Sequence, residues 1–290
     1  MKFNTIQNKN LFLKVCPEMG ASVIKFHEKK SNLDIFRPFD IKKKISKFNC
    51  YFTGYFATIP YFGAIQKKTF LHKDKYISLS KTHILEPDTI HGEGWVSKWK
   101  IKKHTKSSIE LFFKHNGRKS FPHSYQTIQK FELIKNSLNI TISLENLDTN
   151  SFHCGIGFHP WFNISKYSKI YSNTFTYLSQ QKNNKFKKKK LLSNNFLDLN
   201  KNKIDKTFLN WNGKSKLVIN KDLSLIIKNK KNIGNLHVYS PIKENFFCIE
   251  PITNISDAFL VKKSGYHSHD LISLSPKKKF QAKIAFEVLV

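Results

Sequence analysis

The sequence predicts an all-β protein built as a large antiparallel β-sandwich. Apolar and polar residues alternate over several short segments, short polar turns separate these segments, and no long segment has a convincing helical period. The chain has 290 residues, 40% of them hydrophobic, which is enough for a large core. All-β domains of this length often form one unit, so we expect a single domain over residues 1–290.

The clearest strand pattern covers residues 137–144. Leu138, Ile140, Ile142 and Leu144 alternate with polar residues, and this period of two predicts a strand with one buried face. The same reasoning predicts strands at 109–114, 216–220, 223–228 and 282–290.

Residues 179–202 have a different composition. They are rich in lysine, asparagine and glutamine and include four consecutive lysines at 187–190. Such a segment buries little apolar surface, so we expect a long solvated loop. Strand patterns resume directly after it, which favours an excursion from one domain over a boundary between two.

The formal net charge is +30, and it comes almost wholly from lysine. Only Arg37 and Arg118 are arginines, whereas proteins that read nucleic acid use arginine for paired contacts to bases and phosphates. Lysine is spread along the chain with many Asn, Ile and Phe residues, all of which have A/T-rich codons. We therefore expect attraction to polyanions at low salt but no specific nucleic-acid partner.

The apolar runs and the cysteine spacing of the sequence predict the cellular compartment and the redox state of the thiols. It has no run of about 18 apolar residues, and its first 14 residues lack the apolar core of a signal peptide, so we expect a cytoplasmic protein without a membrane partner. Cys16, Cys50, Cys154 and Cys248 lie far apart, with no CxxC pair. This spacing suggests neither a zinc site nor a disulfide framework, and reduced thiols are expected.

Residues 154–163, CGIGFHPWFN, carry the most concentrated chemical signal. The glycines permit a close approach of backbone or ligand, and Pro160 favours an extended conformation at His159. We expect His159 at a strand end beside aromatic side chains, including Trp161. A histidine there could carry a proton near neutral pH, or it could be a core residue with a satisfied hydrogen bond.

Residues 90–95, IHGEGW, form a second segment whose residues indicate a candidate site. His91 and Trp95 lie among glycines, and aromatic rings can stack on the apolar face of a sugar while polar groups meet its hydroxyls. The alternative is a glycine turn with the tryptophans in the core.

Two acidic residues complete the candidates. Glu250 lies in the apolar run 246–252, where a buried carboxylate must be paired or have a shifted pKa, and it could be a general base or the partner of a lysine. Asp205 precedes a short apolar pattern, a position where aspartate is usually a turn or cap residue.

Taken together, these sequence segments resemble the aldose 1-epimerases, the galactose mutarotase family. The resemblance keeps the family order over nearly the whole chain, and it is carried by residues 17–22 (PEMGAS), 34–38 (DIFRP), 59–61 (IPY), 91–92 (HG), 157–162 (GFHPWF) and 250–251 (EP).

The resemblance implies a galactose mutarotase-like β-supersandwich with a sugar in a groove across one sheet. The implied reaction interconverts the α and β anomers of a free aldose by ring opening, and it needs no metal and no organic cofactor. By analogy with the family, Glu250 is the base, His159 is the acid and His91 donates a hydrogen bond near the ring oxygen.

The implied partner is a small sugar, held by a monomer or a homodimer. Asp205 matches the family aspartate that holds sugar hydroxyls, and Trp95 and Trp161 are the expected aromatic contacts. Tryptophan at 95, where many members have arginine, resembles a bacterial subgroup of the family.

The sequence departs from the family at Ala64, where an arginine that contacts sugar hydroxyls is expected. Gln66 and Lys67 are the nearest polar replacements, and Gln66 is the predicted substrate contact. The departure leaves two alternatives to an active epimerase on a free sugar. One is a sugar-binding relative with weak catalysis, and the other is an epimerase for hexose 6-phosphates.

Overall fold

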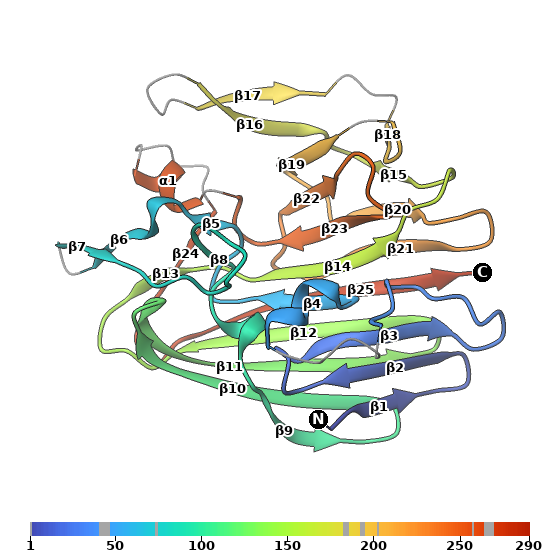
Figure 1. The fold of residues 1–290 in the computed structure, drawn as a ribbon, viewed down its shortest axis with the longest axis horizontal. Coiled ribbons are helices and arrows are strands. Elements are labelled where there is room, and N and C mark those ends of the chain that lie inside the picture. The colour runs from blue at the N-terminus through green and yellow to red at the C-terminus, as the bar shows by residue number, and fades with distance from the viewer. Residues whose placement is uncertain are drawn as a thin grey trace.

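The computed structural model of the protein describes residues 2–40, 47–72, 75–181, 186–191, 195–201, 203–256, 258–263 and 270–290. Two large antiparallel sheets lie face to face over most of the chain (Figure 1). The predicted all-β sandwich is therefore confirmed. Strands β12, β10, β20, β21 and β25 coincide with the five segments in which the sequence predicts strands, with ends that differ by a few residues.

The first sheet has ten strands, and neighbours in it are paired as β1-β2-β3-β4-β14-β23-β22-β19-β16-β17. In that order, their bounds are Asn4–Gln7, Leu11–Cys16, Ser22–Glu28, Tyr55–Thr58, Gly157–Asn163, Phe246–Ile252, Asn235–Ser240, Ile204–Phe208, Thr176–Gln180 and Phe186–Lys190.

The second sheet has nine strands in the order β18-β15-β20-β21-β25-β12-β11-β10-β9. Their bounds are Phe196–Asp198, Lys169–Ser172, Lys214–Val218, Ser224–Lys231, Lys279–Leu289, Ser137–Asn146, Phe121–Ile134, Ser108–Arg118 and Lys100–His104.

Smaller elements lie around one end of the sandwich. Three short two-stranded sheets pair β5 with β8, β6 with β7, and β13 with β24. The bounds of these strands and of the short helices are Ala64–Ile65 (β5), Thr89–Ile90 (β8), Thr69–His72 (β6), Lys75–Ser78 (β7), Phe152–Cys154 (β13), Ile272–Leu274 (β24), Lys47–Phe52 (η1), Gln66–Lys68 (η2), Gly94–Val96 (η3) and Ala258–Lys263 (α1). Within the described ranges, no helix is long and apolar enough to cross a membrane.

The main core lies between the two sheets. Alternate residues of each strand face inward, and aromatic rings meet edge to face across the core. Tyr55 of β4 lies 5.7 Å from Phe131 of β11, and Phe36, in the segment after β3, lies 5.3 Å from Phe286 of β25. All four of these residues are fully buried or nearly so. Burial of one large apolar side chain contributes about 1.5–3 kcal/mol, so this layer fixes the positions of the central strands.

A second apolar cluster covers the opposite, outer face of the first sheet. It includes Phe56 of β4, Trp161 of β14 and Cys248 of β23, and Trp95 of η3 packs on Phe56 with ring centroids 5.1 Å apart. The central strands are therefore buried on both faces near this point, which is where the histidines and Glu250 lie.

The prediction of a loop over 179–202 is wrong for the described part of this segment. β16 ends within it, β17 pairs with β16 along its whole length, and β18 follows. The hairpin of β16 and β17 forms the top edge of the view in Figure 1. The lysine side chains of β17 are exposed, so the strand pairs its backbone with β16 without presenting an apolar face, and no alternation in the sequence reveals it. Lysines on an edge strand also oppose pairing with another chain.

Candidate active site

Four neighbouring strands of the first sheet carry the candidate site on their outer faces. Phe247 and Ile249 of β23 face the core, so the alternation turns Cys248 and Glu250 to the other face. The same rule places Phe158 and Phe162 of β14 inward and His159 outward. The apolar neighbours that pack the core thus determine where the polar side chains point.

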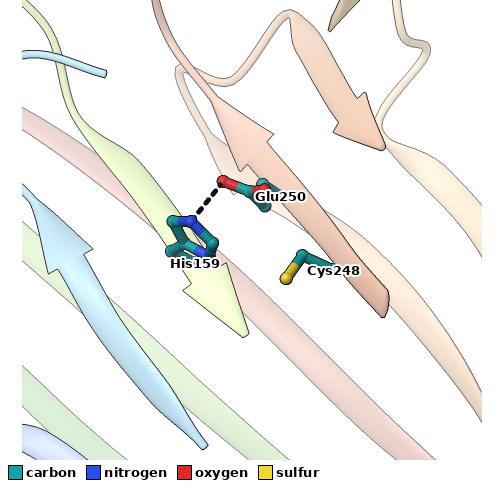
Figure 2. A group of neighbouring side chains, drawn as sticks. All are labelled: His159, Cys248 and Glu250. Atoms are coloured by element: carbon teal, nitrogen blue, oxygen red, sulfur yellow. Dashed lines mark ion pairs between the residues drawn. The ribbon is translucent and has the colours of Figure 1, made fainter. Parts of the chain in front are cut away.

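His159 and Glu250 lie directly opposite each other. β14 and β23 pair with Gly157 across from Ile252 and Trp161 across from Cys248, a register that sets His159 against Glu250. His159 Nε2 lies 3.3 Å from Glu250 Oε2 (Figure 2). The sequence left open a lysine partner for Glu250, but its close partner is this histidine.

Both members of this pair are nearly sealed from solvent. Their side chains are 8% and 2% exposed, respectively. Burial raises the pKa of Glu250 well above its usual value. Burial also lowers the pKa of His159, and the nearby imidazoles of His91 and His237 and the cation of Arg37 add to this effect. Burial therefore favours the uncharged form of each group in this closed site.

His159 lies within β14, two residues from its start, and not at a strand end as expected. Its ring packs on Phe56, with centroids 4.4 Å apart, and runs parallel to that of Trp161 at 5.3 Å and 6°. The guanidinium of Arg37 covers Trp161 at 4.1 Å from the ring centroid. Arg37 donates hydrogen bonds to the carbonyl oxygens of Tyr51 and Thr53, so the stack is anchored at its outer end.

Trp161 is only 7% exposed, and its ring stacks on that of His159, so it helps to orient the imidazole. A contact between Trp161 and a substrate stays a prediction. The Nδ1 atom of His159 is buried and has no hydrogen-bond partner among the described residues. The imidazole is therefore not a core histidine with a satisfied hydrogen bond.

His91 reaches the same place from the turn between β8 and η3. Its backbone is left-handed, with φ of 58°, and its N–H donates to the carbonyl oxygen of Gly63 at 2.9 Å. The N–H of Gly63 donates in turn to His91 Nδ1 at 3.1 Å, which leaves the proton of the neutral ring on Nε2. Burial lowers the pKa of His91 to about 3, so the ring is neutral over the physiological range. Its centroid lies 5.3 Å from that of His159, with the two rings perpendicular.

Asp205 and His237 form the outer part of the site. His237 of β22 lies opposite Glu250 in the strand pairing, and its Nε2 atom is 3.4 Å from Asp205 Oδ1. The hydrogen bond with His237 lowers the pKa of Asp205. The Asp205 side chain is 63% exposed, so it is placed at the rim. Asp205 is the second residue of β19 and not a turn or cap residue.

A cavity of about 260 Å³ lies beside this pair. Its polar lining comes from Gln180, Asp205, Lys206, Thr207, His237 and Ser256, and its apolar lining from Leu178, Phe186, Leu209, Ile255 and Val261. Thr207 Oγ1 and His237 Nδ1 are 2.9 Å apart, which fixes the plane of the His237 ring.

Sequence reasoning missed His237, Arg37 and Cys248 as members of this site. The sequence feature that could have identified His237 and Cys248 is weak. Each lies two positions from another outward-facing residue of the same strand. Arg37 belongs to the DIFRP segment that carries the resemblance, but no local pattern indicates its contact with Trp161, which is far away in the sequence. Cys248 Sγ, together with one nitrogen of His159 and one oxygen of Glu250, forms a set of three ligand atoms that could hold a metal ion.

Two predicted substrate contacts, Trp95 and Gln66, lie outside the group of side chains described above. Trp95 is fully buried, and its Nε1–H donates to the carbonyl oxygens of Ile90 and Gly92, so it cannot offer a face to a sugar. That prediction is wrong because the tryptophan instead holds the turn that carries His91. Gln66 lies exposed on η2, and its contact with a substrate stays a prediction. Ala64 pairs with Ile90, next to His91.

Comparison with known proteins places these features in one family. The aldose 1-epimerase family model matches residues 2–287. The uncharacterized protein YphB of Escherichia coli (strain K12) is 22% identical over 254 residues, which cover 80% of this chain and 83% of that protein.

Solved structures share the fold. A crystal structure described as a candidate aldose 1-epimerase from Escherichia coli K12 has a TM-score of 0.84 at 19% identity and covers 99% of both chains. A galactose mutarotase-like protein from Clostridium acetobutylicum has a TM-score of 0.82 at 18% identity and covers 98% of this chain and 94% of that one. On the match of the family model over nearly its whole length, the chain belongs to the aldose 1-epimerase family.

Proposed function

We propose that the protein is an aldose 1-epimerase that interconverts the α and β anomers of a hexose or related aldose. The observation that carries the proposal is the 3.3 Å approach of His159 Nε2 and Glu250 Oε2 on the outer face of the first sheet. Ring opening requires one group to accept the proton of the anomeric hydroxyl and another to protonate the ring oxygen. Those two oxygens are bonded to the same carbon, so the acceptor and the donor must be neighbours.

In the reacting form of the pair, the one proton that the two groups share lies on His159 and Glu250 is a carboxylate. Glu250 then accepts the proton from the hydroxyl on C1 while His159 gives its proton to the ring oxygen. The bond from C1 to the ring oxygen breaks, an aldehyde forms at C1, and the C1–C2 bond rotates. Ring closure on the other face returns both protons, so the pair begins and ends with the same single exchangeable proton. The raised pKa of Glu250 supports the role of base, because a carboxylate with a higher pKa accepts a proton more readily.

His91 assists as a neutral hydrogen-bond donor. The contact from the Gly63 N–H leaves the proton on Nε2, and the low pKa keeps the ring from becoming a second acid. A donor fixed in this way stabilises negative charge that develops on oxygen as the ring opens. Asp205 at the rim accepts hydrogen bonds from sugar hydroxyls, and His237 orients its carboxylate.

A second candidate is a sugar-binding relative with weak catalysis, and Ala64 favours it. An alanine beside the strand that leads to His91 removes the multi-donor clamp that an arginine would provide. A third candidate is an epimerase of hexose 6-phosphates, which would use some of the many lysines. We rank it below the first because the charge is almost wholly lysine and arginine is scarce.

The test measures anomer exchange by NMR with freshly dissolved α-glucose and α-galactose and a panel of related aldoses. We expect wild-type protein to accelerate exchange for at least one sugar and Glu250→Gln to lose about 10²–10⁴-fold of the acceleration. The matched control is Glu244→Gln, an exposed glutamate on the turn before β23, which should leave the rate unchanged.

The outcomes separate the candidates. No acceleration with any sugar, or full activity in Glu250→Gln, would contradict the leading proposal. Saturable sugar binding with exchange at the spontaneous rate would favour the binding relative. Activity on a hexose 6-phosphate far above that on the free hexose would favour the third candidate.

A further inference from the structure

His159, Cys248 and Glu250 converge on one point of the outer face of the first sheet. One ligand atom from each lies within 4.8 Å of the other two, and all three side chains are buried (Figure 2). Cys248 and Glu250 are two residues apart on β23 and therefore share a face, while His159 comes from β14 beside them. The proton transfer described above makes no use of the thiol.

The spacing fits a tetrahedral metal ion. Two ligands about 2.0–2.1 Å from a tetrahedral zinc are separated by about 3.3 Å. His159 Nε2 and Glu250 Oε2 are already 3.3 Å apart. A zinc-bound sulfur, at about 2.3 Å from the ion, would lie about 3.5 Å from the other two ligand atoms. Cys248 Sγ lies within 4.8 Å of one nitrogen of His159 and one oxygen of Glu250, so it needs to approach by little more than an ångström to bind the same ion.

An unsatisfied buried oxygen also points to a cation. Glu250 Oε2 is buried, and its 3.3 Å approach to His159 Nε2 lacks the geometry of a hydrogen bond, so within the described part of the chain it has no hydrogen-bond partner. Buried polar atoms nearly always have a partner, and a bound cation would supply one. A nitrogen, a sulfur and an oxygen are the donor set of zinc and similar ions, whereas magnesium and calcium select oxygen alone. Three protein ligands leave the fourth position for water.

We propose that His159, Cys248 and Glu250 form a binding site for a zinc-class divalent cation, and that the bound ion inhibits sugar turnover. Binding breaks the S–H bond of Cys248, the sulfur keeps the electron pair to bond the metal, and the proton goes to solvent. The ion then occupies the lone pairs of the acceptor and of the donor, so neither can exchange a proton with a sugar. The inhibitory half rests on the proposed function, but the binding half does not.

Cobalt(II) gives a readout that is independent of activity. We titrate the full chain, freed of metal by chelation, and follow the near-ultraviolet thiolate-to-cobalt charge-transfer absorption. One equivalent of cobalt should produce this band, and zinc should abolish it by displacement. Cys248→Ser should lose the band and weaken zinc binding, measured against a chromophoric chelator, by at least about 10–100-fold.

The matched control is Cys154→Ser, another buried cysteine, which lies on β13 outside the cluster and should keep the band. Cys248→Ala provides a second variant if the serine impairs folding, and circular dichroism verifies that each variant is folded. Absence of the band in wild type, or an equal band in both Cys248 variants, would overturn the site.

Inhibition is measured separately. Zinc should slow anomer exchange by the wild type and by Cys154→Ser at concentrations that leave Cys248→Ala active. Equal inhibition of all three proteins would overturn the inhibitory role. If no sugar is turned over at all, the cobalt band still decides whether the site exists, so failure of the proposed function and failure of the metal site are distinguishable.

Discussion

The two central side chains owe their approach to strand register more than to side-chain flexibility. His159 and Glu250 project from opposing positions of β14 and β23, and the core residues that alternate with them hold both strands. Trp161 and Arg37 then restrict the imidazole from the side. The proposed proton donor and acceptor, held in this way, need little reorganisation before reaction.

Glu93 is a further residue with a specific electrostatic role, close to His91 in the sequence. One oxygen of its carboxylate lies 2.9 Å from His115 Nδ1, and the other accepts a hydrogen bond from Ser120. Burial alone would raise the pKa of Glu93, but these hydrogen bonds outweigh burial, and the pKa lies below its usual value. The carboxylate thus ties the turn that carries His91 to β10 and to the turn before β11.

This shift predicts how stability depends on pH. Because the pKa is lower in the folded state, the contribution of Glu93 is fully present above its unfolded value of 4.5 and is lost as the pH falls through the folded value. Glu93→Gln should lower the free energy of unfolding by about 1–3 kcal/mol at pH 7. The difference from wild type should shrink below pH 4.5, as measured by urea unfolding at a series of pH values.

Glu110→Gln is the control, since the one ion pair of Glu110 within the described ranges is a partly exposed one with Lys102 at 3.6 Å. It should change stability little at any pH. A Glu93→Gln deficit that stayed constant down to pH 3, or that grew on acidification, would contradict the assignment.

At the level of elements, the turn between β8 and η3 is the least regular part of the site and depends on tight packing. Gly92 has φ of 66°, and a Cβ atom there would lie 2.1 Å from the carbonyl oxygen of Ile59 and 2.3 Å from Pro60 Cδ. Gly20 makes a comparable approach to the backbone of Trp95. Close backbone contacts on both sides of this turn therefore restrict the position of the His91 backbone.

Gly92→Ala should displace this turn. We expect a loss of stability of about 1–3 kcal/mol, from the left-handed backbone and the overlap with Ile59, measured by thermal or urea unfolding. Anomer exchange should fall as well, because His91 is the preceding residue.

Gly234→Ala is the matched control, because a Cβ atom at that position meets no atom within 4 Å. Its effect should remain within about 0.5 kcal/mol, with unchanged activity. Equal effects of the two substitutions would show that the turn is more adaptable than its packing indicates.

The elements also show what the sequence could and could not predict. Strands with one apolar face, such as β12, carry a period of two that is visible in the sequence, and these were predicted correctly. β17 has a lysine-rich, exposed surface, so its existence depends on pairing with β16 and leaves no apolar pattern. Alternating apolar residues indicate that one face of a strand is buried. An edge strand with both faces exposed therefore has no such pattern in its sequence.

For the site, motifs predicted which residue types would be important, but not their surroundings. His159, Glu250 and His91 do meet, and Asp205 stands at the edge through His237. Trp95 was misassigned because a tryptophan beside glycines is equally typical of a sugar platform and of a buried support. The contribution of Arg37 depends on tertiary packing, which no local pattern records.

At the scale of the whole molecule, the net charge of +30 is the dominant feature. It predicts attraction to any polyanion, without selection among sequences. Binding to a single-stranded DNA, followed by fluorescence anisotropy, should weaken by about 10³-fold or more between 50 and 200 mM salt if six or more phosphates are neutralised. Different base sequences and heparin should behave alike. Tight binding to one sequence that persists at physiological salt would contradict this view.

The opposed positions of His159 and Glu250 have a consequence for how substrate preference could change. The two side chains belong to paired strands in the middle of a sheet, whereas Asp205, Ala64 and Gln66 lie on other elements. Peripheral segments can therefore be exchanged with those of a relative without disturbing the distance between the pair. Under the proposed function, a chimaera made in this way would inherit the sugar choice of one parent and the ring-opening pair of the other.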